Sequence, residues 1–238
     1  MKKLFILAVL CSFCFAFSYA QNEIVVDPNA SVREISPMFN RIKISHNIKL
    51  VISQSSQVSL AISASEEKYK YQIKTEVSDN TLKIFAEGDN WSAAKNRQFT
   101  VYLSFKQLNR LEASGAVQVL ISGPILENSL VINLSGASSI RGVLDVQTLT
   151  MELSGASKAR LSGKANSFSV ECSGASDVIA FELTAQSCNA TASGASDIQV
   201  SAAKELNAIA SGVSRIYYKG DARANVKQSG VSKIEKRN

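Results

Sequence analysis

The sequence predicts an all-β protein built as a parallel β-helix-like solenoid with rungs of about 18–21 residues. Three observations lead to this fold class. A small-residue tetrad, Ser-Gly-Ala-Ser or a close variant, recurs through the second half of the chain. Apolar residues alternate with polar ones before each copy, and a second apolar column follows each copy. The copies begin at Ser114, Ser135, Ser154, Ser173, Ser193, Ser211 and Ser229, so subtraction gives spacings of 21, 19, 19, 20, 18 and 18 residues.

The segment before each tetrad has the pattern of a strand with one buried face. In the copy at Ser154, the apolar residues Leu149, Met151 and Leu153 alternate with polar ones. A second apolar column lies five residues after each first serine: Val119, Ile140, Ala159, Val178, Ile198, Ile216 and Ile234. A looser return, marked by Gly163 in one copy, is expected to lead to the next strand. Because such a unit cannot bury its own inner face, we expect copies 111–238 to stack around one continuous core.

The tetrad itself is interpreted as a structural corner. Its glycine supplies a positive φ or a close backbone approach, and its serines can bond to the backbone of the turn. We expect alanine at the third position because a crowded corner would exclude larger side chains. A phosphate cradle would require the glycines to open a helix, and no helical period follows any copy. The predicted corner glycines are Gly115, Gly136, Gly155, Gly174, Gly194, Gly212 and Gly230.

Residues 39–110 are predicted to form a β-rich N-terminal part in which the same repeat is degraded. The phrase "IKISHNIKLVIS" aligns with "LEASGAVQVLIS", which places His46 on Gly115 and Leu50 on Val119. His46, the only histidine, is therefore expected at a corner with positive φ, rather than as a metal ligand or a base.

Further elements are expected within this part of the chain. Ser78-Asp79-Asn80 predicts a hairpin turn between the strands "YQIKTEV" and "TLKIFAEG". The phrase "FTVYLSF", residues 99–105, predicts another strand, and the loop before it carries Trp91, the only tryptophan.

Residues 1–20 are interpreted as a cleavable secretory signal peptide. Lys2 and Lys3 precede an apolar run that ends in the small-x-small pattern Ser18-Tyr19-Ala20. The run is short for a membrane span, which needs about 20 apolar residues. Residues 21–38 are expected to form an irregular arm. The mature chain is thus expected in the periplasm, on the outer surface or in the medium, with no transmembrane span.

The mature chain keeps two cysteines, Cys172 and Cys188, which could pair in an oxidising compartment. They fall in different inward columns, one and five residues before a tetrad, so they are offset by about 13 Å along the strand direction. A disulfide requires Cα atoms within about 7 Å of each other. We therefore predict two free, buried thiols.

The charge distribution bounds the possible partners. The formal net charge of +6 is mild and does not favour nucleic-acid binding. Residues 111–203 contain four basic and eight acidic side chains, whereas residues 204–238 contain eight basic and three acidic ones. The basic end has two interpretations: it attracts anionic glycans or lipid headgroups, or it protects an unpaired strand edge from aggregation.

The serial "SGAS" tetrads, together with "FNRIKISHNIKLVISQ" and "TLKIFAEG", resemble the putative auto-transporter adhesin, head GIN domain family, exported proteins of Bacteroidetes-type bacteria. The resemblance covers nearly the whole mature chain. It implies a β-helical fold and an adhesin, which is a non-catalytic protein that presents an extended surface to a glycan or to an envelope or host protein. It implies no catalytic residues and no cofactor.

Two other functions are considered beside binding: a structural, self-associating envelope protein and a polysaccharide-active enzyme. The enzyme would need clustered acids on an outer face, and Asp177 and Asp197 should be neighbours on one outward column. They could share a proton or hold a cation, or they form a solvated edge balanced by Lys158 and Arg215, which we favour. No base for a hydrolytic triad and no zinc-like spacing accompanies them.

The candidate binding residues lie at the ends of the predicted coil. Tyr217 offers a stacking face for a sugar, and Arg215 and Lys233 on one outward column offer charge for an acidic group. Trp91 in its polar loop is a further candidate. The alternatives are that Tyr217 packs on a neighbouring loop and that Trp91 plugs the N-terminal end of the coil.

Overall fold

The computed structural model describes residues 27–87 and 98–237. The predicted signal peptide (1–20) and the loop with Trp91 lie outside the described residues. The first described part contains β1 (Ser31–Arg33), β2 (Arg41–Ile44), β3 (Lys49–Gln54), β4 (Ser59–Ala64), the 3-10 helix η1 (Glu67–Gln72), β5 (Ile73–Ser78) and β6 (Thr81–Ala86). It is followed by β7 (Phe99–Phe105), β8 (Arg110–Ala113), β9 (Gln118–Leu134), β10 (Ser139–Leu153), β11 (Lys158–Cys172), β12 (Asp177–Ala192), β13 (Asp197–Ala210), β14 (Arg215–Lys219), β15 (Arg223–Gln228) and β16 (Lys233–Lys236).

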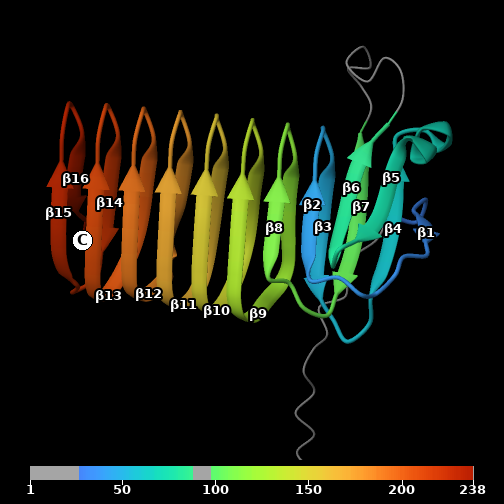
Figure 1. Ribbon diagram of the computed structural model, residues 1–238, viewed down its shortest axis with the longest axis horizontal. Coiled ribbons are helices and arrows are strands. Elements are labelled where there is room, and N and C mark those ends of the chain that lie inside the picture. The colour runs from blue at the N-terminus through green and yellow to red at the C-terminus, as the bar shows by residue number, and fades with distance from the viewer. Residues whose placement is uncertain (1–26, 88–97, 238) are drawn as a thin grey trace, which may run out of the picture.

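These strands form a β-solenoid of about 7 turns, which confirms the predicted fold class. Figure 1 shows the corners aligned along one edge of the coil, with strands leading into them on one face and strands leaving them on the other. We call these the first face and the second face, and we call one turn of the coil a rung. Neighbouring rungs pair in parallel, as where Ile140 lies opposite Ala159 and Met151 opposite Val170.

The return at the other edge of the coil does not interrupt the strand, although the sequence suggests a loop there. Strands β9 to β13 each run continuously from one corner, through the return, to the next corner. Gly163 bends the chain there with φ of 111°, and the register between β11 and β12 shifts between Arg160 and Ser162. The return is therefore a bend within one long strand.

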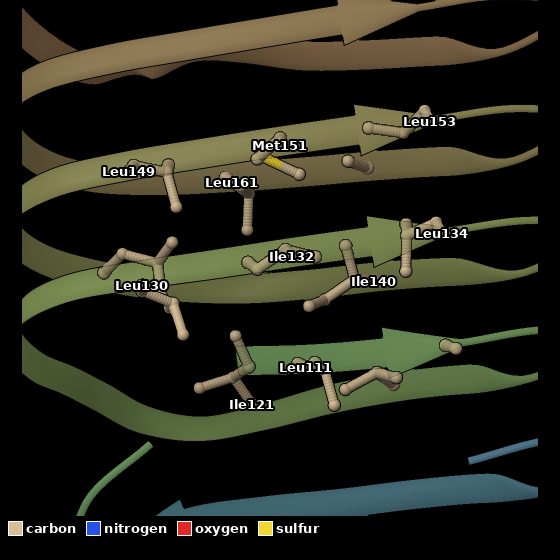
Figure 2. Close-up of a cluster of buried hydrophobic side chains, with 14 of the residues drawn as sticks. Leu111, Ile121, Leu130, Ile132, Leu134, Ile140, Leu149, Met151, Leu153 and Leu161 are labelled. Carbon is tan, nitrogen blue, oxygen red and sulfur yellow. The ribbon is translucent and has the colours of Figure 1, made fainter. Parts of the chain in front are cut away.

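The inward columns fill the space between the two faces. Figure 2 shows Leu149 and Met151 of the first face pointing toward the side of Ile140 and Leu161 of the second face. All four side chains are at most 2% exposed. Burial of such side chains stabilises the fold by about 1.5–3 kcal/mol each, and the benefit exists only when the rungs stack.

The corner glycines have the predicted conformation. Gly155 has φ of +73°, and a Cβ added to it would lie 2.5 Å from the carbonyl oxygen of Gly136 on the preceding rung. The two corners approach closely because the N–H of Ala156 donates to that same oxygen at 2.7 Å.

The expectation about alanine in the corner is wrong. The third tetrad position points to solvent, and Val213 and Val231 at this position are 63% and 80% exposed. The close contact with the preceding rung occurs at the glycine instead. The fourth position is the buried one: Ser157 is 0% exposed, and its hydroxyl donates to the carbonyl oxygen of Ser154 at 2.8 Å.

The degraded N-terminal repeat follows the predicted alignment. His46 occupies a corner with φ of 77°, and its carbonyl accepts the N–H of Ala116 at 2.9 Å. Leu50 pairs with Val119 as expected. The predicted hairpin joins β5 and β6, which are antiparallel. Its two central residues, Asp79 and Asn80, both have positive φ, which is the pattern of a type I′ turn.

The N-terminal end of the coil is covered by antiparallel strands. β4 pairs with β7, and β1 pairs with β4, so the arm expected to be irregular contributes one short strand. The ammonium of Lys70, 6% exposed, donates to the carbonyl of Asn29, to the hydroxyl of Ser31 at 2.9 Å and to Glu67 at 2.6 Å. These bonds fasten the arm to η1.

The two cysteines confirm the predicted geometry. Cys172 and Cys188 are free and buried. Burial raises the pKa of each thiol to about 12, with a smaller contribution at Cys172 from Asp177 and Glu171. Both side chains act as small apolar residues of the core.

Candidate functional site

The outward column that follows the corners carries most of the predicted site residues. Asp177 and Asp197 are rung neighbours, as expected. The ammonium of Lys158 lies 3.0 Å from a carboxylate oxygen of Asp177. Arg215 binds both oxygens of Asp197 at 2.7 and 2.8 Å, and this contact raises the pKa of the guanidinium. Each acid therefore has its own cation, as the balanced-edge interpretation requires, and the described residues contain no group of three side chains suited to a metal ion.

The structure brings Arg215, Lys233 and Tyr217 together on the last rungs, which we call the terminal surface. Arg215 and Lys233 are partners on β14 and β16, and Tyr217 lies in the next outward column. Lys233 pairs with Glu235 at 2.9 Å, which lowers the pKa of that carboxyl. The guanidinium of Arg237 lies 4.3 Å from the centroid of the Tyr217 ring. The stacking face and both charges already have partners within the chain.

A groove of about 590 Å³ runs along the first face beneath the corners. Its floor includes the outward acids Glu112, Glu152 and Glu171 and the first serines of several tetrads. Lys43 lies 3.8 Å from Glu112, whereas Glu152 and Glu171 are neighbours on adjacent rungs. From the sequence alone, the column of Glu112, Glu152 and Glu171 is recognisable only as the polar side of a strand.

Polar residues continue across the first face beyond this groove. The amide of Asn207 donates to Asn189 at 3.0 Å, and the amide of Asn225 donates to Asn207 at 3.4 Å. Thr150 and Ser169 continue the same column toward the N-terminal end. The result is a ladder of hydroxyl and amide groups across a sheet face.

A second groove, of about 440 Å³, lies on the second face. It is lined by Arg141, Lys158 and Arg160 and by the apolar side chains of Leu120 and Ile179. This groove was not expected from the sequence. A sequence signal for it exists, because Arg141, Lys158 and Arg160 are three of the four basic side chains in the acidic stretch 111–203. They fall on two adjacent rungs.

No helix in the described ranges is long and apolar enough to cross a membrane. The grooves reported above lie on the outer surface, and the inward columns are packed with side chains. The chemistry that the described residues offer to a partner is therefore on the flat faces and not in an enclosed pocket.

Comparison with known proteins gives a consistent result. Residues 38–222 match the family model described as "Putative auto-transporter adhesin, head GIN domain". No curated protein matches the chain.

Several solved structures share the fold of this chain. A putative adhesin from Bacteroides fragilis NCTC 9343 is 24% identical with a TM-score of 0.77, over 87% of this chain and 96% of that one. A putative adhesin from Parabacteroides merdae ATCC 43184 is 20% identical with a TM-score of 0.67, over 89% and 98%. A putative lipid binding protein from Parabacteroides distasonis ATCC 8503 is 22% identical with a TM-score of 0.67, over 89% and 98%. At these identities the likeness shows a shared fold.

Proposed function

The chain belongs to the putative auto-transporter adhesin, head GIN domain family, and on this premise we propose that it is an exported, non-catalytic binding protein that presents the faces of its solenoid to a glycan or to a protein. The amino-terminal pattern of Lys2, Lys3 and Ser18-Tyr19-Ala20 supports export through a cleaved signal peptide. The pairing of Asp177 and Asp197 with cations supports the absence of catalysis, because neither carboxylate is left as a free acid or base.

The observation that carries this proposal is the division of the rung into a filled interior and polar outer columns. Inward residues such as Leu149 and Met151 leave no room for a ligand. Outward residues of the first face offer hydroxyl, amide and carboxylate groups in rows spaced by the rung repeat of about 4.8 Å. A flat, polar and repetitive surface suits a long ligand that makes many weak contacts, such as a polysaccharide or an extended protein surface.

The terminal surface is the proposed contact for an acidic sugar. Tyr217 supplies the aromatic face, and Arg215 and Lys233 supply charge. Binding there would require Arg237 to leave the Tyr217 ring or to join the contact, and it would compete with the intrachain carboxylates Asp197 and Glu235.

The test is a glycan array and a host-protein binding assay on the mature protein, at low and high salt. The variant Tyr217→Ser/Arg215→Ser/Lys233→Ser should lose binding, because it removes the stacking face and both cations. A matched control is Lys158→Ser, which removes an ion-paired cation from the same outward column in the middle of the coil. Binding that survives the triple substitution and added salt would exclude the terminal surface. No binding to any glycan or protein would count against the adhesin function itself.

A second function, self-association, is favoured by apolar side chains at the same end of the coil. Val213, Val226 and Val231 are 63%, 47% and 80% exposed. Val226 belongs to an inward column and is exposed because no further described rung covers it. Sedimentation velocity over a hundredfold range of concentration tests this function, and Val226→Ser/Val231→Ser should abolish any oligomer that forms.

One solved relative is described as a lipid binding protein. In this chain the described core is filled, so an acyl chain would have to lie in an outer groove rather than in an enclosed cavity. A lipid would therefore be recognised by the same faces that we propose for glycan and protein.

A further inference from the structure

Two arginines lie side by side in the groove on the second face. Leu120, Arg141, Arg160 and Ile179 occupy successive rungs of one outward column, and the ladder pairs each with the next. Adjacent parallel strands are about 4.8 Å apart, so the two guanidinium groups emerge from neighbouring positions. Both arginine side chains are exposed.

This arrangement costs stability unless something compensates it. Like charges directly opposite each other on a sheet repel. Lys158, in the adjacent column, is neutralised by Asp177, but the guanidinium groups of Arg141 and Arg160 make no hydrogen bond or ion pair with any residue in the described ranges. Glu182 lines the neighbouring hollow without forming an ion pair with them. The pair is also placed in a stretch of the coil whose net charge is otherwise negative.

The surface around the two arginines includes several apolar side chains. A hollow of about 480 Å³ adjoins the groove, shares Arg141 and Arg160 with it, and adds Val143 and Phe181. Val143 is 41% exposed, and the Phe181 ring has the ammonium of Lys219 at 4.9 Å from its centroid. A ligand held by the guanidinium groups would therefore lay the rest of its body against aliphatic and aromatic carbon.

We propose that Arg141 and Arg160 form a binding site for an amphipathic anion, a molecule in which a carboxylate, phosphate or sulfate group is joined to an apolar body. The planar guanidinium has a fork of N–H donors that matches the geometry of such oxyanions. Two guanidinium groups on adjacent rungs can donate to one oxyanion from the same side. The anion removes the repulsion between the arginines, and Leu120, Ile179, Val143 and Phe181 bury part of the apolar body. The site is separate from the terminal surface and does not depend on glycan or protein binding there.

Equilibrium binding to dodecanoate and dodecyl phosphate, below their micelle concentrations, tests this site by isothermal titration calorimetry. Dodecyl maltoside supplies the apolar chain without an anion, and acetate supplies a carboxylate without the chain. The variant Arg141→Gln/Arg160→Gln should bind dodecanoate about tenfold more weakly than the native protein. Lys164→Gln is the matched control, because Lys164 is an exposed cation on β11, the strand of Arg160, but lines neither hollow. Melting curves show whether the variants keep the fold.

The outcomes separate the proposal from its rivals. It stands if dodecanoate binds, dodecyl maltoside and acetate bind much more weakly, and only the double variant loses affinity. It fails if the native protein binds neither dodecanoate nor dodecyl phosphate, if Lys164→Gln loses as much as the double variant, or if acetate binds as well as dodecanoate. Cosedimentation with phosphatidylglycerol/phosphatidylcholine vesicles, lost in the double variant, would identify a membrane lipid as the source of the anion. Binding in solution without cosedimentation would identify a free amphipathic acid.

Discussion

Substituting a corner glycine by valine should be among the most damaging single changes in this coil. Gly155 has φ of +73°, and a Cβ there would lie 2.5 Å from the carbonyl oxygen of Gly136. A residue with a side chain held at such a φ costs about 1–3 kcal/mol. Relief of the overlap requires the two corners to separate, which lengthens the bond of 2.7 Å from the N–H of Ala156 to that oxygen. Loss of that hydrogen bond costs about 0.5–1.5 kcal/mol more.

These contributions sum to a loss of about 1.5–4.5 kcal/mol in the free energy of unfolding for Gly155→Val. Ala156→Val is the control, because it introduces the same side chain one residue later, at the position where Val213 and Val231 are exposed. It should change the stability by less than about 0.5 kcal/mol. Gly155→Ala adds the Cβ that meets the Gly136 oxygen but not the two γ-methyl groups of valine. The difference between the two variants therefore measures what the γ-methyl groups add.

Urea denaturation followed by circular dichroism measures the three variants, and hydrogen exchange at Ala156 reports on the corner itself. If Gly155→Val and Ala156→Val lose equal stability, the tetrad does not act through its glycine. A loss below about 1 kcal/mol for Gly155→Val would show that the rungs can separate at little cost, contrary to the packing argument.

Three further predictions concern other parts of the chain. Mass spectrometry of unreduced, denatured protein should show no disulfide between Cys172 and Cys188, and a linked peptide would contradict the register of β11 and β12. At pH 9 both thiols should resist alkylation until the protein unfolds, because burial raises their pKa to about 12. Asn80→Gly should stabilise the hairpin, because Asn80 has φ of 57° and glycine adopts this conformation without strain. An unchanged urea midpoint would exclude this reason. Lys70→Met should leave the coil folded but should expose the arm near Ser31 to limited proteolysis, and cleavage at the native rate would show that the ammonium does not fasten the arm.

The repeat made much of the fold predictable. Each rung repeats the same local pattern, so the inward column with Met151, the glycine at Gly155 and the separation of Cys172 from Cys188 all followed from alignment. The position of His46 followed in the same way, because its corner aligns with Gly115. Local chemistry decides these features, since a strand alternates its faces and a positive φ favours few residues.

The direction of each corner side chain was not predictable from the same pattern. Small residues at the third and fourth positions suggest crowding at both, yet the alanine is exposed and the serine is buried. A tetrad has no period long enough to show which side faces the core. Only the path of the chain between two strands decides this.

The sequence by itself determined the period, the corner, the inward columns and the resemblance that leads to the family. The balance of Asp197 by Arg215 was expected, but the tertiary structure alone decided how other outward charges are placed: Arg237 covers Tyr217, and Arg141 lies beside Arg160 without an ion pair among the described residues. The reason is physical. Stacking places residues from rungs about 20 positions apart in the chain within about 5 Å of one another, and the partner that a flexible charged side chain then takes depends on the exact register of neighbouring rungs and on the directions of the side chains. Burial constrains the inside of the coil at every rung, but it leaves the outside free to differ, and the outside is where we propose that this protein meets its partners.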